Sequence, residues 1–185
     1  MSHGFELEGR EALPTPAVGG ILGHLLRLQA KVNRGVLFLS MFALLAACAI
    51  LTASVFLRYF LKIPTDWQDE MSVFLLVGAV FMCGAYVQSQ RGHIGIEALA
   101  GFFSPAVNRL RLLFCDTASF AFCAFFTWKS WSMLHEAVVE GQTTSSSWAP
   151  PLWIPYGLMT LGMTLLSLQI LLQIVTSLTS KGQGK

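Results

Sequence analysis

The sequence contains little charge for its length. Only 12% of its 185 residues are Asp, Glu, Lys or Arg, whereas 54% are hydrophobic, and the mean hydropathy is +0.61. A soluble domain normally carries about twice that share of charged residues. The net charge of +2 also gives no strongly basic surface of the kind that nucleic-acid-binding proteins use. We therefore predict a membrane protein with no nucleic-acid partner.

Patterns that carry out chemistry are missing as well. The four cysteines have no C-x-x-C spacing, and they fall in apolar runs where buried thiols are the plain interpretation. No Ser/His/Asp set, phosphate-binding loop, paired carboxylates or metal-ligand cluster can be assembled from the sequence. We expect no enzyme activity, no catalytic, cofactor-binding or metal-binding residues, and no cofactor.

Long apolar runs are abundant. About 20 residues are needed to cross the roughly 30 Å hydrocarbon core of a bilayer as a helix, and runs of this kind are too long for barrel strands. Four of them occur, at about 36–57, 71–90, 110–134 and 152–178. The sequence therefore predicts an all-α integral membrane protein whose domain at 35–180 contains four transmembrane helices.

Basic residues indicate how these helices are oriented, because Lys and Arg are retained on the cytoplasmic side. They occur before the first run, between the second and third, and in the tail at 181–185, whereas the loop before the last run contains no basic residue. The three basic sets share one face of a four-helix protein. We predict that both termini are cytoplasmic.

The N-terminal region divides into two parts. Residues 1–20 contain Pro14 and Pro16 and predict a flexible cytoplasmic tail. At 21–34, basic residues recur every three or four positions opposite a row of aliphatic ones, which predicts an amphipathic helix lying on the inner membrane surface. A simple cytoplasmic extension of the first transmembrane helix is the alternative.

Lys129 lies within the third apolar run, where an unpaired charge costs roughly 2.5–3.5 kcal/mol on insertion scales. We expect it to pair with Glu70 of the second helix, with Asp69 as the substitute. The alternative is that the lysine side chain reaches the membrane interface by itself.

Aromatic and acidic residues mark the predicted outer face. Trp67 and several other tryptophans would anchor the helices among the lipid headgroups. Glu136 and Glu140 share one helical face beside His135, and they are candidates for contact with a partner protein on that side of the membrane. A water-exposed helix end is the plainer interpretation.

Several motifs together resemble the small membrane subunit of TRAP transporters, the DctQ-like family. The first set is Arg58-Tyr59, Pro64, Trp67, Glu70, Gly78, Gly84 and Arg91-Gly92-His93-Ile94, and the second is Glu140-Gly141-Gln142-Thr143, Pro151 to Tyr156 and Gly162. The resemblance covers roughly 32–172. Two positions depart from the family pattern, because Glu97 replaces a more usual Asp and the stretch Ser145 to Trp148 replaces a proline-containing one.

The resemblance implies a tripartite importer in the bacterial inner membrane. In such a system a periplasmic substrate-binding protein captures an organic acid, and a large DctM-like membrane subunit moves it with a sodium gradient. This chain would be a multi-pass subunit that supports the large one and contacts membrane lipids, and any sodium would bind the large subunit. The sequence agrees, because it shows no Gly/Pro-interrupted pair of half-helices of the kind that forms transport sites.

The resemblance also leaves residue roles open. Arg58 either pairs with Glu70 or is solvated among the headgroups. Arg91 and His93 either contact lipid phosphate or the large subunit, or only retain positive charge on the inner side. Two other functions remain as alternatives, namely a haem-bearing membrane anchor of a respiratory enzyme with His93 and His135 as candidate ligands, and an autonomous small transporter.

Overall fold

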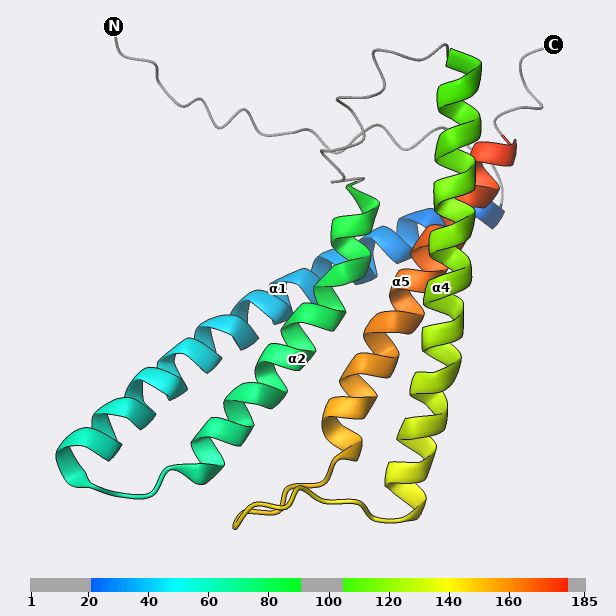
Figure 1. The fold of residues 1–185 in the computed structure, drawn as a ribbon. Coiled ribbons are helices and arrows are strands. Elements are labelled where there is room, and N and C mark those ends of the chain that lie inside the picture. The colour runs from blue at the N-terminus through cyan, green and yellow to red at the C-terminus, as the bar shows by residue number, and fades with distance from the viewer. Residues whose placement is uncertain (1–20, 91–104, 180–185) are drawn as a thin grey trace, which may run out of the picture.

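The computed structural model describes residues 21–90 and 105–179. They form four long α-helices, joined after the first by a short π-helical turn: α1 (Ile21–Phe56), η1 (Leu57–Leu61), α2 (Asp66–Ser89), α4 (Pro105–Val139) and α5 (Trp153–Thr179). The packing order is α1, α2, α5, α4, because α2 packs against both α1 and α5, and α4 packs against α5. Figure 1 shows two helical hairpins, α1–α2 and α4–α5, that converge near the N-terminus of α1 and diverge toward their loops.

The helix boundaries follow from local sequence. The chain leaves η1 through Lys62, which adopts the left-handed conformation (φ 54°), and Pro64 disfavours helix in the residue before it. The Thr65 carbonyl then accepts the first backbone hydrogen bonds of α2, whose first turn carries Asp66 and Asp69 in favourable contact with the positive helix end. Helix α5 contains Pro155 in its first turn, where proline is tolerated.

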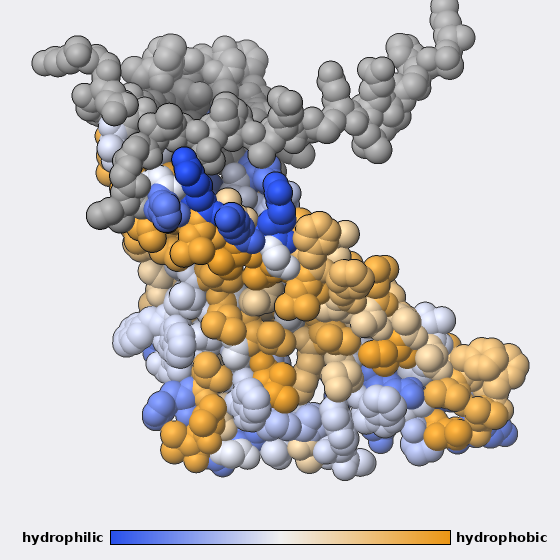
Figure 2. All heavy atoms as spheres, turned by 180° about the vertical axis from the view of Figure 1, so that it is seen from behind, coloured by the Kyte–Doolittle hydropathy of each residue, from blue (hydrophilic) through white to orange (hydrophobic). Residues whose placement is uncertain are grey.

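Among the described residues, three helical segments are long and apolar enough to cross a membrane, at Leu22–Leu61, Asp66–Ser89 and Trp153–Thr179. Helix α4 has 35 residues, which is sufficient length, but it is not one of these three segments. The structure thus supports an all-α membrane protein, and the fourth transmembrane helix stays a prediction. Figure 2 shows hydrophilic residues at both ends of the molecule and much apolar surface between them.

Helix α1 continues without a break through the predicted boundary between an interfacial helix and the first span. At 1.5 Å per residue its 36 residues extend for about 54 Å, well beyond the hydrocarbon thickness. In the structure 21–34 is therefore the first part of α1, as in the alternative interpretation, and its position on a membrane surface stays a prediction. The predicted tails at 1–20 and 181–185 lie outside the described residues.

The packing of α1 uses a repeat of seven residues. Its buried side chains include Asn33, Ser40, Ala47 and Ser54, spaced so that all four lie along one face of the helix, as in the seam of a coiled coil. These residues are small or polar, so α1 approaches α2 closely, as membrane helices with small interfacial residues do. Large apolar side chains on the remaining faces, such as Phe42, are exposed.

Helices α2 and α5 approach each other closely at Gly162. A Cβ at this position would overlap the backbone carbonyl group of Phe81, so only glycine fits without moving a helix. Nearby, Cys123, Met163 and Ile170 form a buried apolar cluster with Phe81 and other partly buried side chains. This cluster is the hydrophobic core between α2, α4 and α5.

Candidate partner-binding surface

A group of buried amides joins α1, α2 and α5 at the end where the hairpins converge. Asn33 is 1% exposed, and its Nδ2 donates to Gln169 Oε1 at 2.9 Å and to the Ala85 carbonyl at 3.4 Å. Its Oδ1 accepts from Gln29 Nε2 at 3.3 Å, and the same Nε2 also lies 3.3 Å from the Leu165 carbonyl. We call Gln29, Asn33 and Gln169 the amide cluster.

A second amide pair lies further toward the same end. Gln88 Nε2 donates to Gln173 Oε1 at 3.0 Å, and Gln173 Nε2 donates to the Gln88 carbonyl at 3.0 Å. Side-chain amides in an apolar environment strongly favour a partner, and here every hydrogen bond of the two groups except Gln29–Asn33 joins two different helices. The two groups therefore fix the relative positions of α1, α2 and α5.

The opposite end of the α1–α2 hairpin is closed by a charged network. Arg58 forms an ion pair with Asp69 at 2.5 Å, while its Nε and Nη2 lie 3.2 and 2.8 Å from Thr65 Oγ1. Ser54 Oγ donates to the other Asp69 oxygen at 3.0 Å. The predicted pair between Arg58 and Glu70 is therefore wrong, because Asp69 faces α1 whereas Glu70, one residue later, points about 100° away around the helix.

Glu70 lies on the face of α2 that points toward α5. Its Oε2 atom and the Oε1 atom of Gln68 are buried and form no hydrogen bond with the described residues. The predicted pair between Lys129 and Glu70 is also absent from the described residues. Lys129 is exposed, and its Nζ lies 5.2 Å from the centroid of the Trp128 ring, within the range of a cation–π contact.

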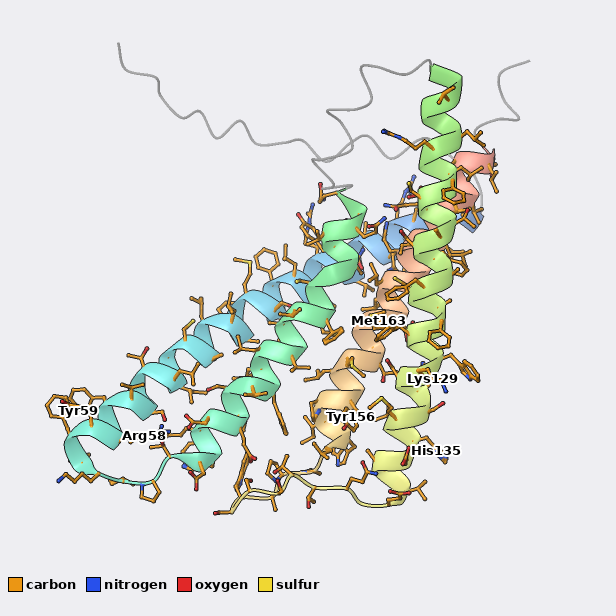
Figure 3. The ribbon with its side chains drawn as sticks, viewed as in Figure 1. Arg58, Tyr59, Lys129, His135, Tyr156 and Met163 are labelled. Atoms are coloured by element: carbon orange, nitrogen blue, oxygen red, sulfur yellow. The ribbon has the colours of Figure 1, made fainter. Side chains whose placement is uncertain are left out.

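The positions of the labelled side chains explain this result. In Figure 3, Lys129 and His135 lie along α4, on the far side of the molecule from Arg58 and Tyr59 in η1. Because Lys129 lies on the exposed face of α4, whose main packing partner is α5, its side chain points away from α2. The spacing of residues along the sequence gave no information about this packing.

The remaining predicted site residues are at the loop end or outside the described part. Glu136 and Glu140 are exposed, and Gln142 Nε2 donates to Glu140 Oε2 at 2.7 Å, which holds the start of the α4–α5 loop. Trp67 packs edge-to-face against Trp148 with ring centroids 6.5 Å apart, so it connects the two hairpins there. Arg91 and His93 lie outside the described residues.

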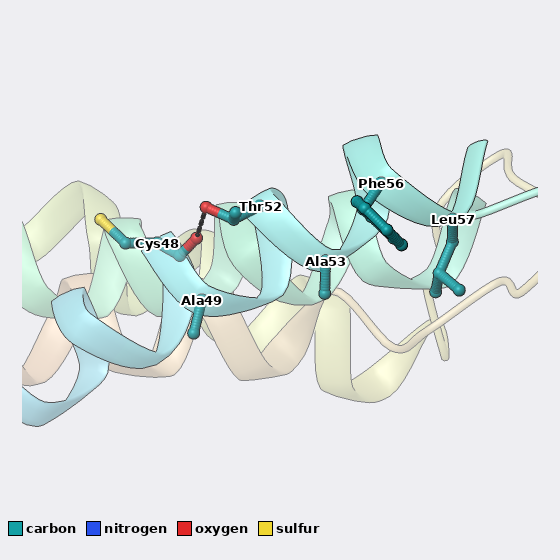
Figure 4. A pocket seen from close by; sticks show the side chains of 6 residues that line it. All are labelled: Cys48, Ala49, Thr52, Ala53, Phe56 and Leu57. Carbon is teal, nitrogen blue, oxygen red and sulfur yellow. Dashed lines mark hydrogen bonds between the residues drawn. The ribbon is translucent and has the colours of Figure 1, made fainter. Parts of the chain in front are cut away.

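The outward face of α1 carries a shallow groove, which we call the α1 groove. It is lined by Cys48, Ala49, Thr52, Ala53, Phe56 and Leu57. At 100° per residue these positions lie opposite the buried seam of α1. The Thr52 hydroxyl donates to the Cys48 carbonyl at 2.8 Å, as Figure 4 shows. Its hydrogen bond is thus made within the helix, and the groove presents an apolar surface.

The amide cluster was not predicted from the sequence. A signal was present, because Asn33, Ser40, Ala47 and Ser54 recur every seven residues. The prediction for 21–34 used the basic residues instead, and these lie on the opposite side of the helix from Asn33. In the described part of the chain, no three His, Cys, Asp or Glu residues come together as metal ligands.

Comparison with known proteins shows which family the sequence matches. A sequence model of the family "Tripartite ATP-independent periplasmic transporters, DctQ component" matches residues 47–180. The chain is also 24% identical, over 163 residues, to the C4-dicarboxylate TRAP transporter small permease protein DctQ of Vibrio cholerae, and the match covers 75% of this chain and 70% of that protein. No solved structure matches the chain.

Proposed function

The chain belongs to the DctQ component family of tripartite ATP-independent periplasmic transporters, as a small membrane subunit, and from this membership we propose what it does there. It supports a large DctM-like membrane subunit in the sodium-coupled uptake of an organic acid. A periplasmic binding protein captures that acid and delivers it. The family is a transporter component and not an enzyme family, and sodium, where it is used, binds to the large subunit.

The observation that carries the proposal is the extent of the family match. It runs from the last third of α1 through α2, α4 and α5, so it includes the close approach of Gly162 to Phe81, whereas Gln29 and Asn33 precede it. The match therefore covers the helical frame of the molecule and not one short motif.

The continuous helices favour a role as a scaffold for the large subunit over a role in moving the substrate. Transport sites in membrane proteins commonly use broken helices whose free backbone groups bind the substrate near the middle of the bilayer. Here α1, α2 and α5 each run as one continuous helix. A continuous frame fixed by buried amides suits a subunit against which another protein moves.

The proposed orientation places the amide end of the molecule in the cytoplasm of a bacterial cell and the loops at the periplasmic face of the inner membrane. Arg27, Lys31 and Arg34 are exposed on the first turns of α1 at that end, in agreement with the retention of positive charge on the cytoplasmic side. The Trp67–Trp148 contact, Glu136 and Glu140 then lie on the side where the binding protein docks.

The α1 groove is the surface that best fits a transmembrane helix of the large subunit. Among the three segments that are apolar enough to span a membrane, the one containing α1 is the least buried. Small residues such as Ala49 and Ala53 allow another helix to approach closely. Membrane helices associate through such packing, since lipid offers no hydrophobic driving force between them.

Affinity purification from native membranes in mild detergent, followed by mass spectrometry, tests the proposal. We expect a much larger multi-span protein to be recovered in stoichiometric amount. Ala49→Phe together with Ala53→Phe should reduce that recovery, whereas Val55→Phe, which exchanges one exposed apolar residue for another outside the groove, should not. Recovery of the chain alone, or with a redox enzyme, would contradict the proposal.

Two other functions give different results. A haem-bearing anchor would show a Soret band in the absorption spectrum of the purified protein, with His135 as one candidate ligand. An autonomous transporter would move solute when the chain is reconstituted alone. The family membership favours neither of them.

A further inference from the structure

A cavity lies inside the wedge between α1, α2 and α5. It has a volume of about 190 Å³ and is lined by Leu39, Ser40 and Ala43 of α1, by Leu75, Gly78, Ala79 and Met82 of α2, and by Leu158 of α5. The residues from α1 and α2 come from the central parts of segments that are apolar enough to span a membrane. The cavity therefore lies at the depth of the hydrocarbon core.

The cavity is dry. Apart from Ser40, every lining residue has an apolar side chain or is a glycine. The Ser40 hydroxyl donates to the Val36 carbonyl of its own helix at 2.9 Å. A buried water needs two to four polar partners, and an apolar cavity of about 150 Å³ is known to remain free of water and to bind a small hydrocarbon instead. The cavity here is larger than that and offers no free polar group.

The shape of the cavity follows from the sequence around it. Gly78 and Ala79 of α2 and Ala43 of α1 leave space where larger side chains would meet. A Cβ on Gly78 would come within 3.0 Å of the Leu158 side chain, so the space is narrow on the α5 side. Two helical turns beyond Ser40, Asn33 joins the helices and closes the wedge.

The cavity opens onto the lipid-facing surface. Leu39, at its rim, is 63% exposed, and it belongs to the continuous exposed apolar surface of α1 that includes Phe38 and Phe42. In a membrane, acyl chains cover the part of this surface that a partner helix in the α1 groove leaves free. A slot that is narrow, dry, closed at one end and open to acyl chains at its rim matches the form of a single hydrocarbon chain.

We infer that this cavity binds one acyl chain of a membrane phospholipid, which fills the wedge between the α1–α2 hairpin and α5. The bound chain replaces contacts that the diverging helices cannot make with one another, because an unfilled apolar space forfeits the dispersion contacts of its lining. The inference depends only on the position of the chain in a membrane, and it does not require the proposed transport function.

Photolabelling of the chain in its native membranes tests this inference. The probe is a phosphatidylcholine that carries a diazirine in one acyl chain, and labelled residues are mapped by mass spectrometry. We expect label on Met82 and Leu158, which line the cavity, in addition to Val55, which faces bulk lipid. Ala43→Phe fills the cavity and should abolish labelling of Met82 and Leu158 while labelling of Val55 continues.

Ala46→Phe is the matched control, because Ala46 is exposed on the same helix but does not line the cavity; it should leave all three labelled. Ala43→Leu provides a smaller filling variant if the phenylalanine prevents folding. Labelling of Val55 without Met82 and Leu158 in the unmodified chain would overturn the inference, and so would labelling of Met82 that is unchanged in a folded Ala43 variant. A photo-crosslink from the cavity to a protein partner in place of lipid would overturn it in favour of a partner side chain.

Discussion

The two ends of the molecule are held in different ways. At the amide end, polar side chains connect helices that belong to different hairpins, as Asn33 does when it bonds to α2 and α5 together. At the loop end, the polar contacts are made within a hairpin, as in the pairing of Arg58 with Asp69 or the backbone bridge between Thr143 and Pro151. Between the hairpins, the edge-to-face contact of Trp67 with Trp148 crosses the loop end.

This difference indicates where the molecule is fixed and where it can adapt. Buried amides are expensive to separate in an apolar medium, so the amide end holds the hairpins at a constant angle. At the loop end the hairpins meet through the ring contact of Trp67 with Trp148, and an apolar wedge lies between them. A partner that binds at the loop end therefore meets surfaces whose spacing is set from the other end.

The close contact between the hairpins at Gly162 should give the largest effect. Gly162→Ala places a methyl group against the Phe81 carbonyl, and because backbone cannot rotate away, the helices must separate. We expect a loss of about 3 kcal/mol in the free energy of unfolding, measured by titration with sodium dodecyl sulfate in mixed micelles. Gly157→Ala is the control, since a Cβ there lies 3.9 Å from Leu134 in ordinary contact; equal stability of the two variants would contradict the described packing.

Removal of the amide cluster should give the next largest effect. Asn33→Leu leaves Gln29 and Gln169 without one of their partners, and we expect a loss of about 1.5 kcal/mol in the free energy of unfolding. Ser40→Ala lies in the same buried seam but removes only a hydroxyl that bonds its own helix, so it should change little. If Asn33→Leu is as stable as the parent chain, the amide end does not hold the hairpins.

The contact at the loop end should contribute less. A double-mutant cycle of Trp67→Ala and Trp148→Ala isolates the coupling energy of the two rings, which we expect to be about 0.5 kcal/mol at these half-exposed positions. A coupling energy above that of Asn33 with Gln169, measured in the same way, would reverse the comparison between the two ends.

Lys129 should contribute least. Its ammonium group lies over Trp128 on an exposed face, and we expect Lys129→Met to change the free energy of unfolding by less than about 0.5 kcal/mol. The yield of folded protein provides a second readout. A marked loss in either measurement would restore the idea of a buried ion pair between α4 and another helix.

Features that depend on neighbouring residues are those that the sequence indicates most directly. The apolar runs at 71–90 and 152–178 overlap most of α2 and α5. The sequence separates the basic pattern at 21–34 from the apolar run after it by composition, whereas helical geometry continues through Arg34 and Gly35 without a break, as in the alternative interpretation, and the interfacial position of 21–34 stays a prediction.

Features that depend on which helices are neighbours could not be predicted in this way. The partner of Arg58 was placed one residue too far along α2, which changes the face of the helix by about 100°. Lys129 was assigned a partner on α2, although α4 packs mainly against α5 and Lys129 lies on its exposed face. The amide cluster depends on three helices at once, and no pattern in the sequence indicates that Gln29, Asn33 and Gln169 lie together.

Transport by a reconstituted complex tests the proposed function most directly. The large membrane subunit recovered with this chain is placed in proteoliposomes, with or without the chain, and uptake of the radiolabelled organic acid that the binding protein carries is measured under an imposed sodium gradient. We predict uptake only when the chain is present, and none by the chain alone. Equal uptake by the large subunit without the chain would contradict the proposal that this protein supports the transporter.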